Sequence, residues 1–181
     1  MNSIKKLFLI ALSISVLTSC AKIFYSADAI PVAHSHKTIA IIPPTVSIAA
    51  GRKTDAEAIK EQQKTESLNF QKEIYAWMLK RKMQGKLTQE ILDVETTNAK
   101  LISAGYPKKA MTPSEICAVL GAGGGSTNEI RVSLNINDCT GKKLIWNYDH
   151  KYSGGIGSSP SRLVDAMMRK ASTKMPYIMT E

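Results

Sequence analysis

The clearest pattern along the chain is an alternation of apolar and polar residues toward its C-terminus. Apolar side chains occupy every second position from Ile130 to Ile136, and polar side chains stand between them. A period of two is typical of a β-strand with one buried face. We therefore predict a strand from Asn128 onward, a turn over residues 138–141 and a returning strand over 143–153, which together form a β-hairpin. The returning strand places four side chains on one face: Trp146, Tyr148, His150 and Tyr152.

Two further patterns predict a buried strand and a long helix in the first half of the chain. The apolar, β-branched run at residues 38–42 is typical of a buried strand, and it ends at a pair of prolines. Over residues 54–84, apolar residues recur at helical spacing, which predicts an amphipathic helix. Gly85 stands where the C-cap of that helix is expected.

The remaining elements complete a single domain. A strand is predicted over residues 86–94 and a short helix over 97–104. Another helix is expected from Thr112, where Pro113 and Glu115 complete a capping-box pattern. The chain closes with a helix whose apolar stripe consists of Leu163, Val164, Met167, Met168, Ala171 and Met175. We therefore expect an α/β fold: one small mixed sheet with helices packed on it, ending in the hairpin and the last helix.

A glycine-rich run, Gly-Ala-Gly-Gly-Gly-Ser, occupies residues 121–126. A phosphate-binding glycine loop follows a strand and precedes a helix, whereas here a predicted helix precedes and a predicted strand follows. We therefore reject a phosphate site and predict a flexible connector. Whether the run is a native loop or replaces a deleted segment stays open.

The first residues have the layout of a secretory signal. Two lysines at positions 5 and 6 precede an apolar run over residues 7–17. This run is shorter than the roughly 20 residues that a membrane-spanning helix needs. The residues that follow, Leu17-Thr-Ser-Cys20, resemble the lipobox at which bacterial lipoproteins are cut and lipidated. We predict a signal peptide over residues 1–19, lipidation of Cys20 and a tether over 20–36 that carries a domain over 37–181.

Ordinary secretion is the alternative interpretation, with Ser19 as the small residue at the cut and Cys20 as a free thiol. If Cys20 is lipidated, two or three acyl chains would make its anchoring in the membrane effectively permanent. Each buried methylene contributes about 0.8 kcal/mol to the free energy of membrane binding. The residue directly after the cysteine is Ala21. An aspartate at this position would resemble the signal that retains lipoproteins at the inner membrane in some bacteria. We therefore expect the outer membrane, with the domain facing the periplasm or the cell surface.

The chain is basic. Removing residues 1–19 takes away two lysines and no acidic residues, so the net charge of +9 falls to +7. Outside the cytoplasm, a positive surface fits anionic lipid headgroups, lipopolysaccharide or an acidic protein better than nucleic acid. Lysines that merely solvate helix faces explain the charge equally well. We expect contact with the membrane through Cys20, an envelope protein partner and no nucleic acid, and a homo-oligomer stays open.

The remaining cysteines and the histidine pair suggest no cofactor or metal. Cys117 lies in a helical pattern and Cys139 in the predicted turn, and we expect them not to pair, although this compartment permits disulfides. His34 and His36 could hold a metal ion on one side of an extended segment. No further ligand stands near them in the sequence, so we interpret this segment as a linker.

An enzyme with a dispersed site is a third possibility, using His150 with Asp149 or Glu129. No nucleophile, base and orienting group can be named together around this histidine. We therefore expect a protein that is not an enzyme.

The hairpin contains Asp138-Cys-Thr140-Gly141, followed by a strand with Trp146. This motif resembles the Asp-turn-Thr-Gly-strand-Trp pattern of envelope proteins related to CsgG, the N-terminal domain of TolB and LpoB. The order of elements is also similar over about residues 37–176. One departure is that the glycine-rich run stands where the family has an apolar strand, which the channel-forming members follow with membrane-inserting hairpins.

The resemblance implies an α/β domain like the N-terminal domain of TolB, which is of the anticodon-binding-domain type. It also implies a non-enzymatic module that docks on an envelope machine or helps to assemble one. The alternative that the family permits is a subunit of a CsgG-like secretion channel whose membrane hairpin is missing or replaced here.

Overall fold

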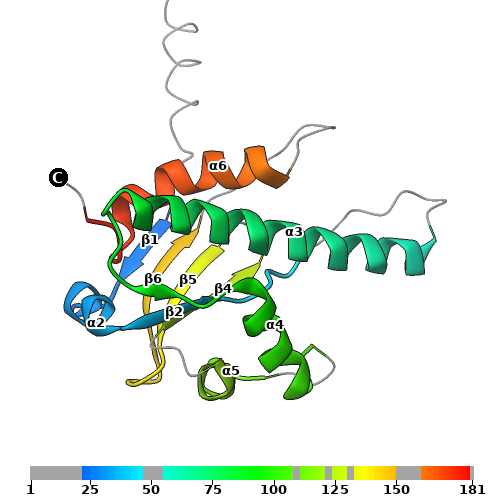
Figure 1. Ribbon diagram of the computed structural model, residues 1–181, viewed down its shortest axis with the longest axis horizontal. Helices are drawn as coiled ribbons and strands as arrows, with labels where there is room; N and C mark the ends of the chain where they lie inside the picture. Colours follow the sequence, from blue (N-terminus) through cyan, green and yellow to red (C-terminus); the bar gives the residue numbers. More distant parts are fainter. Residues whose placement is uncertain are drawn as a thin grey trace, which may run out of the picture.

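The computed structural model describes residues 22–46, 55–107, 111–120, 124–129, 133–149 and 160–179, and it contains both strands and helices (Figure 1). The elements are β1 (Lys22–Tyr25), α2 (Ala29–Ser35), β2 (Thr38–Ile41), α3 (Ala56–Met83), β3 (Glu90–Ile91), α4 (Val94–Ser103), α5 (Pro113–Leu120), β4 (Gly124–Glu129), β5 (Ser133–Asp138), β6 (Lys143–Asp149), α6 (Pro160–Ala171) and the short 3₁₀ helix η1 (Ser172–Lys174).

Within the described residues, one mixed sheet unites all the strands in the order β1-β6-β5-β4-β2-β3. The strand β2 runs parallel to both β3 and β4. The other pairings, β4 with β5, β5 with β6 and β6 with β1, are antiparallel. The predicted fold class, a small mixed sheet with helices packed on it and a final hairpin and helix, is therefore confirmed.

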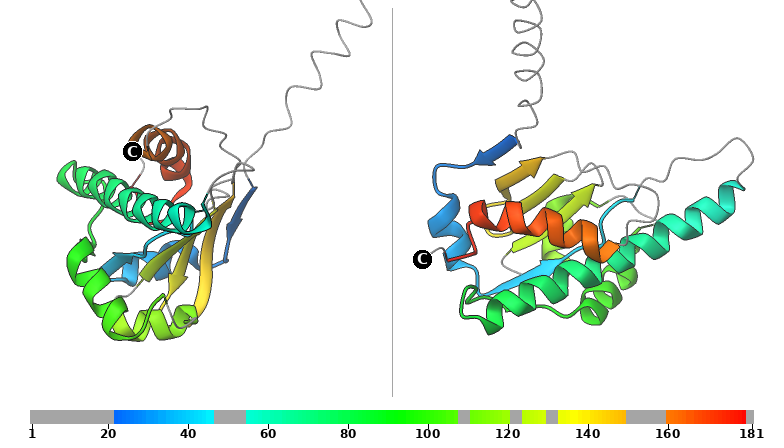
Figure 2. Two further views of the ribbon diagram at one scale, coloured as in Figure 1. Left: turned by 90° about the vertical axis from the view of Figure 1, so that its right-hand side faces the viewer. Right: turned by 90° about the horizontal axis from the view of Figure 1, so that it is seen from above.

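The helices α3 and α6 cover one face of the sheet, and α4 and α5 lie at the β2 end of the other face (Figure 2). The main core contains residues of α3, α6 and the inward side of the strands, among them Ile39 and Ile41 of β2. A smaller core lies on the opposite face, where α4 and α5 pack against Ala40 and Ile42. Because consecutive residues of a strand point to opposite faces, this one short apolar strand serves both cores, which explains its continuous hydrophobicity.

The long helix α3 begins and ends where the sequence predicts. The Asp55 side chain accepts a hydrogen bond from the Glu57 N–H at its start. At its end, Gly85 has a φ of +73°, the left-handed conformation that glycine adopts without strain. With about 1.5 Å of rise per residue the helix is roughly 42 Å long. Its N-terminal part therefore extends past the edge of the sheet (Figure 1).

The predicted tether over residues 20–36 is wrong for residues 22–36. β1 pairs with β6, with Lys22 opposite Asp149 and Tyr25 opposite Trp146. The helix α2 follows and buries Ala29 and Ala33 in the main core. Every residue of β1 is exposed, so the strand has no apolar alternation of its own, and its ladder with a distant strand is what orders it. Residues 22–36 therefore belong to the folded domain and not to a tether.

The glycine-rich run is also more than the predicted connector. Gly124 to Ser126 belong to β4, which lies between β2 and β5 and forms ladders with both. Residues 121–123 lie outside the described residues. A central strand can draw its backbone hydrogen bonds from two neighbours, so it can form even where glycines provide no side chain to pack.

The alternation from Asn128 to Ile136 does not form one strand, as the sequence predicts, but spans two antiparallel strands. Asn128 lies in β4 and pairs with Leu134 of β5. Residues 130–132, which separate the two strands in the sequence, lie outside the described residues. A period of two can continue across a tight connection, so the pattern alone does not reveal the reversal.

The remaining elements follow the predictions with shifted boundaries. The strand expected over residues 86–94 is limited to β3. The helix α4 starts three residues earlier than predicted, because the Asp93 side chain caps it by accepting a hydrogen bond from the Thr96 N–H at 2.7 Å. Thr112 and Glu115 form the expected capping box of α5. The β5–β6 hairpin is confirmed, and so is α6, whose apolar stripe is mostly buried.

Candidate functional site

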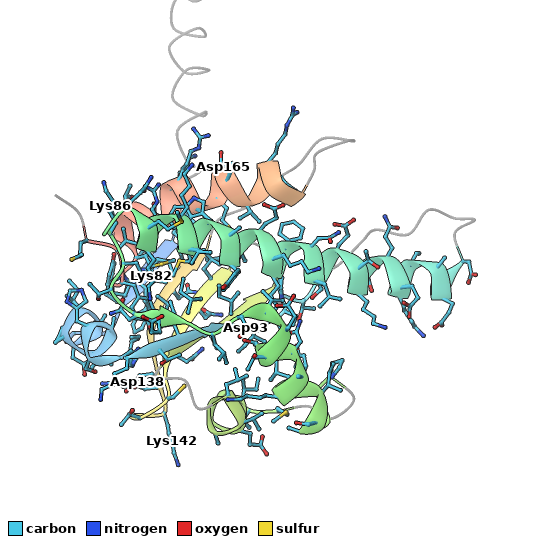
Figure 3. All side chains as sticks on the ribbon, in the orientation of Figure 1. Lys82, Lys86, Asp93, Asp138, Lys142 and Asp165 are labelled. Atoms are coloured by element: carbon cyan, nitrogen blue, oxygen red, sulfur yellow. The ribbon has the colours of Figure 1, made fainter. Side chains whose placement is uncertain are left out.

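The motif residue Asp138 organises the turn between β5 and β6. Its Oδ1 accepts a hydrogen bond from the Thr140 N–H at 3.0 Å, and its Oδ2 accepts one from the Gly141 N–H at 2.7 Å. Aspartate at the start of a turn commonly binds the backbone ahead of it in this way. A Cβ at position 141 would overlap Asp138 Oδ2, so the turn requires glycine there. Figure 3 shows Lys142 extending away from this end of the hairpin.

The same carboxylate binds a buried histidine that sequence reasoning assigned to a linker. His36 Nε2 lies 3.0 Å from Asp138 Oδ1, and His36 Nδ1 lies 2.6 Å from the Tyr177 hydroxyl. The side chains of His36 and Asp138 are only 3% and 7% exposed. We call His36, Asp138 and Tyr177 the polar latch, because they join the start of β2, the hairpin turn and the C-terminal segment.

The surroundings shift the pKa values of Asp138 and Tyr177, so that Asp138 favours its charged form and Tyr177 its neutral form. Burial alone would raise the pKa of Asp138, but hydrogen bonds from His36 and from the Gly141 and Thr140 N–H groups outweigh it, so the pKa lies below its ordinary 3.8. Burial raises the pKa of Tyr177, and the nearby charge of Asp138 raises it further. A carboxylate only accepts hydrogen bonds, so His36 donates from Nε2, and in that tautomer Nδ1 accepts from the Tyr177 hydroxyl.

The polar latch is suited to holding the fold together and not to catalysis. Both ring nitrogens of His36 are occupied by protein groups, and Tyr177 is buried with it. A general base needs an open approach for the proton it removes. His34 lies exposed on α2, so the structure separates the two histidines that were considered as a metal pair.

Trp146, the last motif residue, is fully buried in the main core. It stacks on Tyr148 with ring centroids 6.1 Å apart. All four motif residues therefore act on the structure: Asp138, Thr140 and Gly141 form the turn, and Trp146 fills the core beneath the hairpin.

The other predicted site residues are only partly brought together. Cys20 and His150 lie outside the described residues. Glu129 and Asp149 lie at the same end of the sheet, since each pairs with Ser133 from opposite sides. No group of three or more histidine, cysteine, aspartate or glutamate residues in the described part of the chain could hold a metal ion.

Cys139 forms a disulfide, whereas the sequence favoured no pairing between Cys117 and Cys139 and left the question open. The side chain of Cys117 lies outside the description. The sequence shows which residue types neighbour a cysteine along the chain, but not which cysteine lies within the 4.4–6.8 Å or so between Cα atoms that a disulfide needs.

Beyond the end of β2 lies a pocket of about 400 Å³ that the sequence did not reveal. Its walls come from the segment after β2, from α3 and from α4, and include Pro43, Pro44, Leu68, Leu101 and Ile102. Among the described residues that line it, the only ionisable ones are Lys64 and Tyr106, and burial raises the pKa of Tyr106. This composition suits binding of an apolar group better than acid–base chemistry.

The edge strand β1 exposes a row of large apolar side chains. Ile23, Phe24 and Tyr25 are 37%, 47% and 40% exposed, and Leu144 on the neighbouring β6 is 40% exposed. The Tyr25 hydroxyl donates a hydrogen bond to the Lys174 carbonyl, which fixes this ring against η1. Such a row on an unpaired sheet edge is unusual in a protein surface that only meets water.

Comparisons with known proteins give no match: no family model, no curated protein and no solved structure matches this chain. No helix in the described ranges is both long enough and apolar enough to span a membrane.

Proposed function

We propose that this chain is a bacterial envelope lipoprotein whose small α/β domain acts as a non-enzymatic binding or assembly module. The lipid is carried by Cys20, and the anchored domain lies at the outer membrane. The observation that carries this proposal is the Leu17-Thr-Ser-Cys20 sequence directly after a basic and apolar leader of signal-peptide length.

Three features of the structure support the proposal. The Cys139 disulfide fits a compartment outside the cytoplasm, where disulfides persist. With Cys20 assigned to lipid, Cys117 is the remaining cysteine that could be its partner. The motif residues have structural roles, and the pocket beyond β2 has an apolar lining suited to binding.

The resemblance to CsgG, TolB and LpoB also gains support from β4. The family places a strand after the helix that ends in Leu-Gly, and here β4 follows α5, which ends at Leu120. Only residues 130–132 separate β4 from β5. A membrane-inserting hairpin needs about 10 residues in each strand, so a binding module is favoured over a channel subunit.

Lipidation is tested by mass spectrometry of the mature protein and by membrane fractionation. We expect the signal residues 1–19 to be absent and Cys20 to carry a diacylglycerol, and we expect any Cys20→Ala protein that has lost its signal residues to be in the soluble fraction. The control Ser19→Ala keeps a small residue before the cut and should stay membrane-bound. A mature Cys20 without lipid, or a Cys20→Ala variant that has lost residues 1–19 and is still membrane-bound, would contradict the proposal.

Partner binding is tested with a photo-crosslinking residue at Ile102, an exposed side chain on the wall of the pocket. The matched control position is Met83, which is exposed at the end of α3 and does not line the pocket. We expect the Ile102 variant to form one discrete adduct with an envelope protein in intact cells and the Met83 variant to form none. Equal adducts, or none at either position, would count against a binding module that uses this pocket.

A further inference from the structure

We propose that the edge strand β1 lies in the headgroup region of the membrane that holds the lipid on Cys20, so that the strand is a second membrane contact. The proposed occupant of this surface is an anionic lipid bilayer. The inference rests on the proposed function, because it takes the lipid on Cys20 as the first contact.

The chain leaves almost no slack between the lipid and the fold. Only Ala21 separates Cys20 from Lys22, the first residue of β1. An extended chain covers at most about 3.6 Å per residue, so Lys22 lies within roughly 7 Å of the lipidated cysteine. A tether of 17 residues would let the domain move freely relative to the membrane. Because β1 is paired with β6, the sheet is instead held close to the lipidated cysteine.

The side chains of β1 suit an interface between water and lipid. Ile23 and Tyr25 lie on one face of the strand and Phe24 on the other, and all of them are exposed. Aromatic residues gather at membrane interfaces because their rings are apolar and, in tyrosine, the tip is polar. Leaving three such side chains in water is unfavourable, and partial burial among headgroups and upper acyl chains removes that cost.

The charge near the strand matches anionic headgroups. Lys22 begins β1, and Lys174, whose carbonyl accepts from Tyr25, is exposed on η1 beside it. Each lysine close to an anionic membrane contributes about 1 kcal/mol of attraction. The basic character of the mature chain acts in the same direction.

The strand β1 lacks the features that usually prevent an edge strand from pairing with a strand of another chain. Edge strands are commonly shielded by proline, bulges or several charges, whereas β1 contains only one lysine among four residues and no proline. A second copy of the chain could also pair with such an edge. The lipid is held within two residues of the strand, whereas a second copy must diffuse to it, so the membrane is the occupant that the geometry favours.

The test uses the full lipidated protein in vesicles of phosphatidylethanolamine and phosphatidylglycerol, with bromine atoms on the upper acyl chains as quenchers. Phe24→Trp reports from β1. Leu79→Trp is the matched control, since Leu79 has a similar exposure and lies on α3, which packs against β2 and β3 at the opposite edge of the sheet from β1 (Figure 2). The wild-type signal of Trp77 and Trp146 is subtracted from both variants.

We expect bromination to quench the Phe24→Trp signal at least twofold and to leave the Leu79→Trp signal within 10% of its value in unbrominated vesicles. Equal quenching of the two variants would overturn the inference. So would a Phe24→Trp emission change that depends on protein concentration and not on bromination, because it would indicate a second copy on β1.

Mass spectrometry of the same sample separates this inference from the proposal on which it rests. If Cys20 carries lipid and Phe24→Trp is not quenched, the membrane contact of β1 is wrong and the lipoprotein assignment stands. If Cys20 carries no lipid, both are wrong. Circular dichroism of both variants verifies that each tryptophan variant keeps the fold, as expected for substitutions of exposed residues.

Discussion

Replacing Asp138 by alanine is expected to lower the free energy of unfolding by about 3 to 5 kcal/mol, because three hydrogen-bond donors lose their acceptor at once. His36 Nε2 would be left buried without its partner, and the Thr140 and Gly141 N–H groups would lose the carboxylate that holds the turn. Urea denaturation followed by circular dichroism measures the change, with an unchanged slope indicating that stability alone has shifted.

The control for this prediction is Asp138→Asn, which keeps an acceptor oxygen but removes the charge, so its loss should be smaller. The pH dependence gives a second readout. The folded-state pKa of Asp138 lies below the unfolded value, so its stabilising contribution is complete above about pH 4 and is lost as the pH falls through the folded-state pKa. The alanine variant should lack this part of the acid dependence. An Asp138→Ala variant as stable as the wild type would show that the polar latch does not stabilise the fold.

Replacing Trp146 by alanine is expected to lower the free energy of unfolding by about 3 to 5 kcal/mol, because packing contacts are lost. The side chain is completely buried, belongs to the main core and stacks on Tyr148. The cavity would open beneath the strand that holds β1 in place, since Tyr25 pairs with Trp146. Thermal and urea unfolding measure the loss.

Two controls separate packing from hydrogen bonding at this position. Trp146→Phe keeps an aromatic ring and removes a buried indole N–H that has no hydrogen-bond partner in the described part of the chain, so it should cost clearly less than alanine. Leu144→Ala changes an exposed residue on the same strand and should cost under about 1 kcal/mol. If Leu144→Ala and Trp146→Ala cost the same, the core assignment of Trp146 is wrong.

The elements that were predictable from the sequence are those whose signals are local. The caps of α3 and α5, the helical stripe of α6 and the turn at Asp138 each depend on residues within one or two turns of chain. The strands β1 and β4 were missed because neither has an apolar alternation. Each is held by backbone hydrogen bonds to strands that are distant in the sequence, and no local pattern reports such a pairing.

The candidate site shows the same division. Asp138, Thr140, Gly141 and Trp146 could be selected from one short motif, but their function in the turn and the core required the structure. The members of the polar latch are too far apart for sequence reasoning, since His36 lies 102 residues before Asp138 and 141 residues before Tyr177. The pocket beyond β2 likewise needs three separate elements to form its walls.

The polar latch also bears on when the chain can finish folding. Tyr177 closes on His36, and Lys174 accepts a hydrogen bond from Tyr25, so both ends of the domain meet only after its final residues exist. Contacts across such long stretches of chain form late and slowly, because the entropy of closing the loop opposes them. For a polypeptide exported through a narrow translocation pore, that delay is an advantage. Under the export proposed above, such a chain would stay open until Tyr177 has crossed, and the polar latch would close only on the far side.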